Sequence, residues 1–506
     1  MRCVFVTTKA EFSQYAVLFR PSPLKIATGM PNFAPMTLTS QDSAFFTDFY
    51  QLTMSRGYFA AGISEDSAVF EYHFRRNPFG GGYAIFAGLG DLLETLSSLR
   101  FGPGELDFLR AMGFDEEFVG RLKRFRFRGE LWAMREGEVV FPFEPIVRVK
   151  APLIEGQLIE TILLNTLNFQ TLVATKAMRM RYVAGERTLM EFGLRRAHGL
   201  GGLQASRAAL VGGFDATSNV LAAKRFGINV AGTMAHAWVQ AFEDELTAFR
   251  RYAQTYPDKT TLLIDTYDVL RSGVPNAIAV AKELRAQGKE LYAVRLDSGD
   301  LAYLSKKARH ALDEAGFPNV KIIATNDLDE RLIASLIQQS APIDGYGVGT
   351  KLVTAYDQPA LGGVYKILAV KGKPRIKISE NVIKMTLPGA KTAWRYVDEA
   401  GMFMADGVGP ENALAPSRIY HPFEAGVEST LESYKPTPLL EKAMAGGKPT
   451  GAVPSVADAA AYARARFALL PDEHKRFENP HVYRVGVAKQ TLEIRNRLVK
   501  KYQTGK

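Results

Sequence analysis

Between residues 185 and 370, short apolar segments are followed by residues that could act as nucleophiles, acids or anion ligands. In chain order these are Arg195 and Arg196, then His236, Asp265, Arg295 with Asp297, Asn326, and the turn Gly347–Thr350. A neutral imidazole has an unprotonated nitrogen available near neutral pH, and a guanidinium group matches planar anions such as carboxylate and phosphate. A turn flanked by glycines can present backbone N–H groups to a phosphate. The chemistry that this set favours is the handling of anionic, phosphate-bearing substrates.

Taken singly, each of these groups has an ordinary structural explanation. A lone histidine such as His236 more often caps a helix or fills the core than reacts. Asp297, within Asp297–Asp300, is typical of turns and helix caps, and Arg195 with Arg196 could be a solvated pair. The convergence of the whole set on the ends of successive segments is what favours a functional site.

The elements that must position these residues are strands alternating with helices. The predicted strands are Thr188–Phe192, Asn229–Gly232, Thr261–Asp265, Leu291–Leu296, Val320–Ala324, Ile343–Val348 and Val364–Val370, and the predicted helices between them include Pro275–Gln287 and Asp327–Gln338. Such alternation predicts a parallel α/β sheet, and the number of units is closer to a closed barrel than to one dinucleotide-binding half. Neither a G-x-G-x-x-G turn after a strand nor a G-x-x-x-x-G-K-[ST] loop occurs, so the common nucleotide fingerprints are absent from the sequence.

The 506 residues divide into four predicted parts. Residues 1–40 are a disordered lead or an over-extended start, 41–184 an N-terminal α+β domain, 185–372 the α/β barrel, and 373–506 a C-terminal extension. Ala68–Phe74 alternates as a strand does, and helices are expected at 456–468 and 488–500. The uncharged stretch Thr161–Thr175 is too short and too polar to span a membrane, so it predicts an interior helix.

Composition excludes several classes of protein. With 47% hydrophobic and 23% charged residues the chain is typical of a folded globular protein, and its single cysteine, Cys3, excludes a disulfide scaffold and a cysteine-bound zinc site. The net charge of +10 favours anionic partners, but the charges are scattered and form no basic arm for nucleic acid. The expectation is a cytoplasmic protein that binds a phosphorylated small molecule, with neither a nucleic acid nor a membrane as partner.

At the level of motifs the chain resembles the nicotinate phosphoribosyltransferase family. The segments that carry the resemblance are Thr47–Met54 (TDFYQLTM), Glu191–Gly199 (EFGLRRAHG), Gly212–Val220 (GGFDATSNV), Gly232–Trp238 (GTMAHAW), Val294–Leu301 (VRLDSGDL), Thr325–Glu330 (TNDLDE), Tyr346–Leu352 (YGVGTKL) and Leu469–His481 (LLPDEHKRFENPH). They span nearly all of the chain after residue 40.

The resemblance implies an incomplete, seven-stranded TIM-like α/β barrel, flanked by the N-terminal α+β domain and the C-terminal extension. It further implies a homodimer whose active sites are shared between subunits. The implied reaction belongs to NAD biosynthesis: nicotinate and phosphoribosyl pyrophosphate give nicotinate mononucleotide and pyrophosphate, with coupled hydrolysis of ATP and with Mg²⁺ as cofactor. Displacing pyrophosphate at an anomeric carbon builds positive charge on the sugar and negative charge on the leaving group, which is why cations are needed there.

The resemblance also assigns roles to residues. His236 would be the transiently phosphorylated histidine, Asp265 would orient its imidazole, and Asp297 would bind ribose hydroxyls or the Mg²⁺. Phe192 and, from the partner subunit, Tyr50 would stack on the pyridine ring. The remaining implied substrate-binding residues are Arg195, Arg196, Thr217, Ser218, Arg295, Asn326, Gly347, Gly349 and Thr350.

Two alternatives remain open from the sequence. The nicotinamide-using relative carries an aspartate at the position that aligns with Ser218, where it would accept a bond from a carboxamide and repel a carboxylate. The neutral Ser218 therefore favours nicotinate. The second alternative is a non-catalytic, anion-binding protein that kept the barrel, against which the complete set of strand-end residues argues.

Overall fold

The computed structural model describes residues 43–504, all within the compact unit Ser40–Lys506. The predictions for Cys3 and for residues 1–40 lie outside the described residues. Three sheets of seven, six and six strands and one two-stranded ribbon make up the β structure of this part of the chain.

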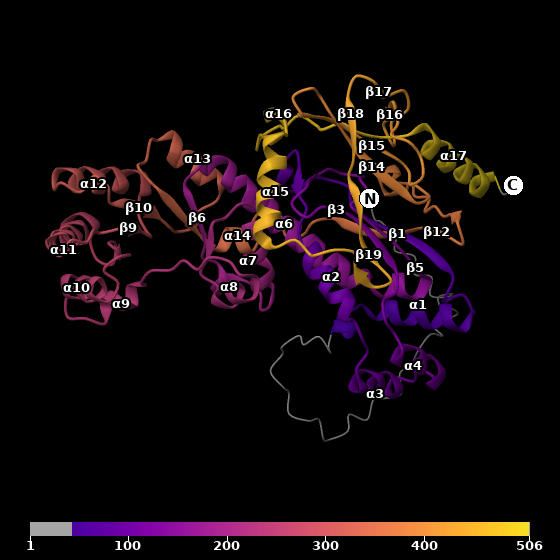
Figure 1. The fold of residues 1–506 in the computed structure, drawn as a ribbon, viewed down its shortest axis with the longest axis horizontal. Helices are drawn as coiled ribbons and strands as arrows, with labels where there is room; N and C mark the ends of the chain where they lie inside the picture. The colour runs from indigo at the N-terminus through magenta and orange to yellow at the C-terminus, as the bar shows by residue number, and fades with distance from the viewer. Residues whose placement is uncertain (1–42, 505–506) are drawn as a thin grey trace, which may run out of the picture. The chain divides into compact units, whose positions relative to one another are not determined.

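The strand-end residues are positioned by a parallel sheet (Figure 1). In spatial order its strands are β7 (Ala216–Thr217), β6 (Thr188–Glu191), β11 (Gly345–Val348), β10 (Lys321–Ala324), β9 (Ala293–Leu296) and β8 (Thr261–Leu263). Every pairing is parallel, and β6, the earliest in the chain, lies beside β11, the latest. The spatial order is therefore the chain order closed into a circle and opened between β7 and β8.

Helices alternate with these strands, as the sequence predicts. They are α7 (Gly201–Val211), α8 (Val220–Phe226), α9 (His236–Gln240), α10 (Glu245–Thr255), α11 (Val274–Ala286), α12 (Leu301–Glu314), α13 (Glu330–Gln338) and α14 (Thr350–Val353). The expected helices Pro275–Gln287 and Asp327–Gln338 are confirmed as α11 and α13. Polar side chains start several of them: Asp300 caps α12 and Asp329 caps α13 by accepting backbone N–H bonds.

One predicted strand of the parallel sheet is wrong. Val364–Val370 lies in β12 (Gly363–Val370), which pairs antiparallel with β1 (Ser67–Phe74) in a different sheet. An apolar pattern indicates a buried strand but not which strand it pairs with. The sequence therefore could not decide between the parallel sheet and the antiparallel sheet for this strand. Two further details differ. The short strand β7 was not predicted, and Asn229–Gly232 makes only one isolated parallel bridge, from Val230 to Thr217.

The antiparallel sheet joins distant parts of the chain. Its order is β13 (Lys373–Pro374), β12, β1, β5 (Val147–Pro152), β3 (Glu130–Met134), β19 (Leu440–Ala445) and β20 (Lys448–Pro449). The predicted strand Ala68–Phe74 is confirmed within β1. Strands from before residue 153 and after residue 362 thus share one sheet, and the chain between them forms the parallel sheet.

The third sheet lies in the C-terminal part of the chain. Its order is β17 (Glu428–Thr430), β16 (Arg418–Tyr420), β21 (Val485–Val487), β15 (Phe403–Pro410), β14 (Lys391–Val397) and β18 (Lys435–Pro438), and the ribbon is β2 (Ala84–Ile85) with β4 (Val139–Val140). The other helices are α1 (Phe49–Ala60), α2 (Leu89–Ser98), α3 (Pro103–Ala111), α4 (Glu116–Lys123), α5 (Leu153–Leu158), α6 (Glu160–Ala184), α15 (Val456–Ala468), α16 (Asp472–Lys475) and α17 (Lys489–Thr504). The helices expected at 456–468 and 488–500 are confirmed as α15 and α17.

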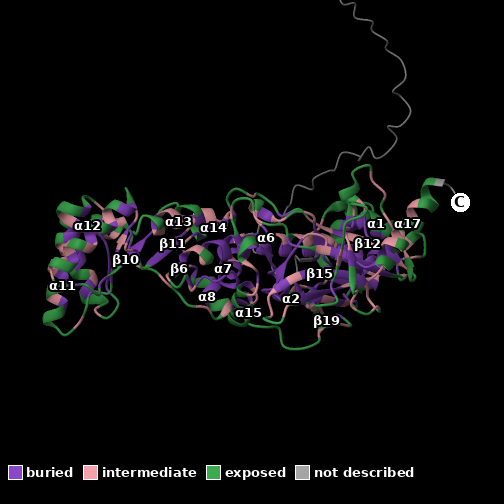
Figure 2. Cartoon of the chain, turned by 90° about the horizontal axis from the view of Figure 1, so that it is seen from above, coloured by how far each residue is buried: buried purple, intermediate pink, exposed green. Residues whose placement is uncertain are grey.

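The long helix α6 is the interior helix that Thr161–Thr175 predicts. It packs on both α7 and α13, which belong to the segment carrying the parallel sheet, and Figure 2 shows it among buried residues. Within residues 43–504, no helix combines the length and the apolar character that crossing a membrane requires.

Candidate active site

The imidazole of His236, the first residue of α9, lies among strand-end groups from β8 and β9. Its Nδ1 lies 3.1 Å from the hydroxyl oxygen of Thr266, and its Nε2 lies 3.8 Å from a carboxylate oxygen of Asp297. The side chains of His236 and Asp297 are 39% and 36% exposed, so a substrate can reach both. The structure thus brings together the predicted histidine and one of the two predicted aspartates.

The expected role of Asp265 is corrected. One of its carboxylate oxygens, Oδ2, accepts the backbone N–H of Asp297 at 2.8 Å and the hydroxyl of Ser298 at 2.6 Å. It therefore braces the turn after β9, while Thr266, the next residue in the chain, holds the imidazole. The sequence could not distinguish Asp265 from Thr266 because neighbouring side chains at the end of a strand point in different directions. A shift of one position along the chain changes which of them faces the ring.

Two buried atoms in this group carry no hydrogen bond within the described residues: Oδ1 of Asp265 and Nε of Arg295. Arg295 donates a hydrogen bond from its other side to the hydroxyl of Thr233. Its burial lowers the pKa of the guanidinium, although Asp297 and Asp265 act in the opposite direction. Buried polar atoms without partners are costly and are expected where a ligand completes the hydrogen bonding.

The aromatic ring of Phe192 packs directly on Gly347, near the end of β11. A Cβ atom added to Gly347 would lie 2.6 Å from the ring of Phe192 and 2.6 Å from the methyl group of Thr325, so only glycine fits there. Phe192 also donates its backbone N–H to Val348 at 2.8 Å. The predicted pyridine-stacking residue and the predicted phosphate turn are therefore adjacent.

The sequence reasoning missed the part that Glu191 plays in this arrangement. Its fully buried carboxylate accepts hydrogen bonds from the backbone N–H of Gly193, from Ser206 at 2.9 Å and from Thr217 at 2.5 Å. The backbone carbonyl of Glu191 accepts the N–H of Ser218 at 2.8 Å. A carboxylate placed at the end of an apolar strand, directly before Phe192 and a glycine, was the available signal.

Asn326 lies in an unusual backbone conformation. It has a φ of 90° and the following Asp327 a φ of 42°, although neither is glycine. Two consecutive residues in the left-handed region are strained, and such strain clusters at functional sites. Asn326 stays a predicted site residue.

The remaining predicted residues are distributed around this centre. Thr217 is buried and Ser218 is half-buried after β7, whereas Arg195 and Arg196 are exposed on the turn after β6. Gly349 and Thr350 follow β11, where Thr350 begins α14. Tyr50 does not lie near these groups in the same chain, because it is on α1, which packs on α5. Its side chain is 47% exposed. Partial burial and, to a smaller extent, the negative charge of Glu160 raise the pKa of its hydroxyl.

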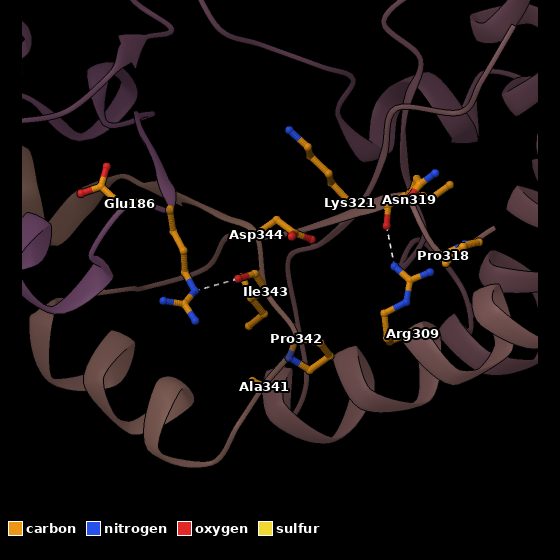
Figure 3. Close-up of a pocket in the computed structure, with 11 residues that line it drawn as sticks. Glu186, Arg309, Pro318, Asn319, Lys321, Ala341, Pro342, Ile343 and Asp344 are labelled. Atoms are coloured by element: carbon orange, nitrogen blue, oxygen red, sulfur yellow. Dashed lines mark hydrogen bonds between the residues drawn. The ribbon is translucent and has the colours of Figure 1, made fainter.

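A cavity of about 550 Å³ lies at the other end of the parallel strands. Its lining includes Arg187 and Asp344 directly before β6 and β11, Lys321 at the start of β10 and Arg309 of α12, and none of the predicted site residues (Figure 3). Catalytic groups of α/β barrels gather at the carboxyl ends of the strands, so the strand-end cluster is the better candidate. Among the described residues, no group of three or more His, Cys, Asp or Glu side chains could by itself hold a metal ion.

The strand ends of this parallel α/β sheet carry a histidine, an arginine and carboxylates. This arrangement is typical of α/β enzymes that act on anionic substrates. Comparison with known proteins specifies the family. Family models described as the nicotinate phosphoribosyltransferase (NAPRTase) N-terminal domain, family and C-terminal domain match residues 45–168, 187–402 and 390–495.

Similar proteins cover most of the chain. A nicotinate phosphoribosyltransferase of Bacillus subtilis is 47% identical over 453 residues, covering 87% of this chain and 92% of the relative. A human nicotinate phosphoribosyltransferase is 35% identical, covering 89% and 96%. The crystal structure of human nicotinic acid phosphoribosyltransferase superposes with a TM-score of 0.81 at 34% identity, covering 89% of this chain and 99% of that one. The chain belongs to the nicotinate phosphoribosyltransferase family.

Proposed function

We propose that the protein forms nicotinate mononucleotide and pyrophosphate from nicotinate and phosphoribosyl pyrophosphate, coupled to ATP hydrolysis, as a cytoplasmic enzyme of NAD biosynthesis. The observation that carries the proposal is the cluster of His236, Asp297 and Arg295 at one edge of the parallel sheet, in a chain of this family. The cluster combines a nucleophile with anion-binding groups, which is what phosphoribosyl transfer coupled to a phosphorylated enzyme requires.

The pyridine ring of nicotinate would bind against Phe192, with its carboxylate toward Ser218 and the exposed pair Arg195 and Arg196. The hydrogen bonds of Glu191 connect the segments that carry Phe192 and Ser218, which supports this placement. A neutral serine leaves room for a carboxylate, whereas an aspartate there would repel it.

The phosphate groups of phosphoribosyl pyrophosphate would bind along the turns after β10 and β11. Gly347, Gly349 and Thr350 would present backbone N–H groups to the 5′-phosphate, and Asn326 would contact the adjacent ribose or phosphate oxygens. Arg295 would bind the leaving pyrophosphate, since its Nε–H donor has no hydrogen-bond acceptor among the described residues.

His236 would accept the γ-phosphoryl group of ATP. If Nδ1 carries the proton and donates a hydrogen bond to the hydroxyl oxygen of Thr266, the lone pair of Nε2 is on the side of the ring that faces Asp297. Nε2 would then form the bond to phosphorus while the bond from phosphorus to the leaving ADP oxygen breaks. Asp297 lies at the distance where its charge stabilises the imidazolium that develops during attack.

The cofactor Mg²⁺ fits the residues present. Mg²⁺ is usually bound by one or two carboxylates together with substrate phosphates, so the lack of a three-residue group in residues 43–504 does not oppose it. Asp297 would hold it, and the unpartnered buried oxygen of Asp265 is a second donor of the right chemistry. When bound, the ion would neutralise charge on the departing pyrophosphate.

We further propose an incomplete seven-stranded barrel, with Asn229–Gly232 in the seventh position. The circular strand order supports it, as does the bridge between Val230 and Thr217 at the open edge. Met190 of β6, Ala216 of β7, Ala293 of β9 and Ile323 of β10 share one hydrophobic cluster, as they would inside a barrel.

A homodimer with shared sites would bring Tyr50 to the pyridine. Helix α1 supports this because Phe49, Tyr50 and Met54 are 52%, 47% and 38% exposed, an apolar surface suited to a second copy. Mixing inactive Tyr50→Ala and His236→Ala subunits should restore roughly a quarter of the activity, since half of the dimers then contain one intact site. If the subunits exchange and activity stays absent, Tyr50 and His236 belong to the same chain's site.

Pyrophosphate release with phosphoribosyl pyrophosphate and each pyridine in turn tests the main proposal. Turnover with nicotinate supports it, and preference for nicotinamide favours the alternative activity. No release with any pyridine, while phosphoribosyl pyrophosphate still binds, favours a non-catalytic anion-binding protein.

A further inference from the structure

The strained turn after β10 and the glycine turn after β11 are linked by an ion pair. Lys351, directly after the Gly347–Thr350 turn, places its Nζ 2.6 Å from a carboxylate oxygen of Asp329. The other oxygen of Asp329 accepts the N–H of Leu332 at 2.8 Å and so caps α13. Burial favours the neutral form of Asp329, but the hydrogen bond and charge of Lys351 outweigh it and lower the pKa of the carboxyl.

A second set of charges holds the neighbouring residue from behind. Glu330 accepts hydrogen bonds from Lys176 at 3.1 Å and from Arg179 at 2.8 Å, both on α6. The three side chains are 1–3% exposed. A buried carboxylate between two buried cations tolerates little displacement, because any shift leaves a charge unpaired in a poorly polar interior. The start of α13 is therefore tied both to α14 and to α6.

Between these ties and β10 lies the left-handed backbone of Asn326 and Asp327. Such a conformation persists only where the surrounding structure holds it. After the buried Leu328, the first charged residues that hold its C-terminal side are Asp329 and Glu330, two and three residues beyond Asp327.

We propose that the Asp329–Lys351 pair is a positioning device that holds Asn326 and the Gly347–Thr350 turn in the geometry that binds phosphoribosyl pyrophosphate. Neither residue touches the substrate in this proposal, which rests on the proposed function for the identity of that substrate. The amino group of Lys351 is occupied by Asp329 and lies 5.5 Å from the centre of the Tyr356 ring, so it is directed to the protein.

Three variants separate this role from direct phosphate binding by Lys351. Asp329→Asn keeps the helix cap, because asparagine is also a good N-cap, but removes the charge. Lys351→Met keeps much of the length of the side chain and removes its charge. If the pair acts as a unit, each single variant should raise KM for phosphoribosyl pyrophosphate about tenfold, and the double variant should be no worse than either.

At a temperature where every variant is folded, KM for nicotinate and all parameters of Lys351→Arg should stay nearly constant. Lys289→Met is the matched control. Lys289 forms an ion pair of similar length, 2.5 Å, with Asp258, which is more exposed and lies before β9 and β8, at the opposite end of the strands. It should leave KM for phosphoribosyl pyrophosphate unchanged.

Each outcome decides the proposal. If Lys351→Met raises KM while Asp329→Asn leaves or lowers it, Lys351 binds the phosphate itself and the positioning role is overturned. Additive effects, or equal losses for both substrates, also overturn it. Failure of the proposed function is distinguishable, because the unmodified enzyme would then not turn over nicotinate and phosphoribosyl pyrophosphate at all.

Discussion

The two ends of the parallel sheet differ in how their polar groups are satisfied. At the amino end, Arg187 and Arg309 line the cavity, but their guanidinium groups already donate hydrogen bonds within the protein. Arg187 donates to the carbonyl of Ile343 at 3.0 Å and Arg309 to the carbonyl of Phe317 at 2.6 Å. At the carboxyl end, buried atoms of Asp265 and Arg295 lack partners within residues 43–504.

The cavity and the residues that could react therefore lie at opposite ends of the parallel sheet. The arginines of the cavity donate hydrogen bonds to backbone carbonyls of other lining residues, Ile343 and Val320 (Figure 3). The carboxyl end has a buried donor and a buried acceptor without partners within residues 43–504, which a ligand can satisfy, and a strained backbone at Asn326. Buried unpartnered atoms also occur elsewhere in residues 43–504, but here they coincide with the strand-end residues, and four experiments test the comparison of the two ends.

The largest effect is expected at His236. His236→Ala should abolish ATP hydrolysis stimulated by nicotinate, because alanine has no nitrogen that can accept the phosphoryl group, while slow uncoupled transfer can survive. Incubation with γ-labelled ATP should yield an acid-labile, base-stable label on the peptide around His236. Label on another peptide, or normal coupling in the alanine variant, would remove His236 from this role.

Ser218→Asp should change the preference between pyridines. A carboxylate beside the substrate carboxylate costs several kcal/mol in a half-buried setting, so kcat/KM for nicotinate relative to nicotinamide should fall about 100-fold. Ser218→Asn adds similar volume without charge and should change the ratio much less. An unchanged ratio in the aspartate variant would place Ser218 outside the pyridine site.

Glu191→Gln should have a smaller effect on one substrate. The amide cannot accept at both ends, so one of the bonds to Gly193, Ser206 and Thr217 is lost, at a cost of about 1–3 kcal/mol. We expect KM for nicotinate to rise about tenfold, with KM for phosphoribosyl pyrophosphate nearly constant. Glu283→Gln, which removes an exposed partner of Arg250, is the control. Equal changes for both substrates would show general damage instead.

The smallest effect on activity is expected at the cavity. Arg309→Met removes hydrogen bonds to the carbonyls of Phe317 and Val320 and should lower stability by about 1–3 kcal/mol, measured by denaturant unfolding. Because these groups lie at the amino end of the strands, kcat/KM should stay within about twofold at temperatures where the protein is folded. A large loss of activity without loss of stability would contradict the comparison between the two ends.

Much of the local structure was predictable because it depends on neighbouring residues. The amphipathic segments at 275–287 and 456–468 are helices, and Ala68–Phe74 is a strand. The order of polar residues after successive strands was also readable, since parallel strands place their carboxyl ends together. Partner choice was not: Val364–Val370 has the pattern of a barrel strand but pairs with β1.

By itself, the sequence determined the family, the alternation of strands and helices, and the residue types available at the strand ends. Only the tertiary structure decided that Thr266 rather than Asp265 holds the ring of His236, that Glu191 gathers three segments, and that Asp329 pairs with Lys351. The physical reason is directional. A hydrogen bond or ion pair between segments far apart in the chain forms only where the distance between two atoms is right to within a few tenths of an ångström. The order of residues along the chain does not contain that distance.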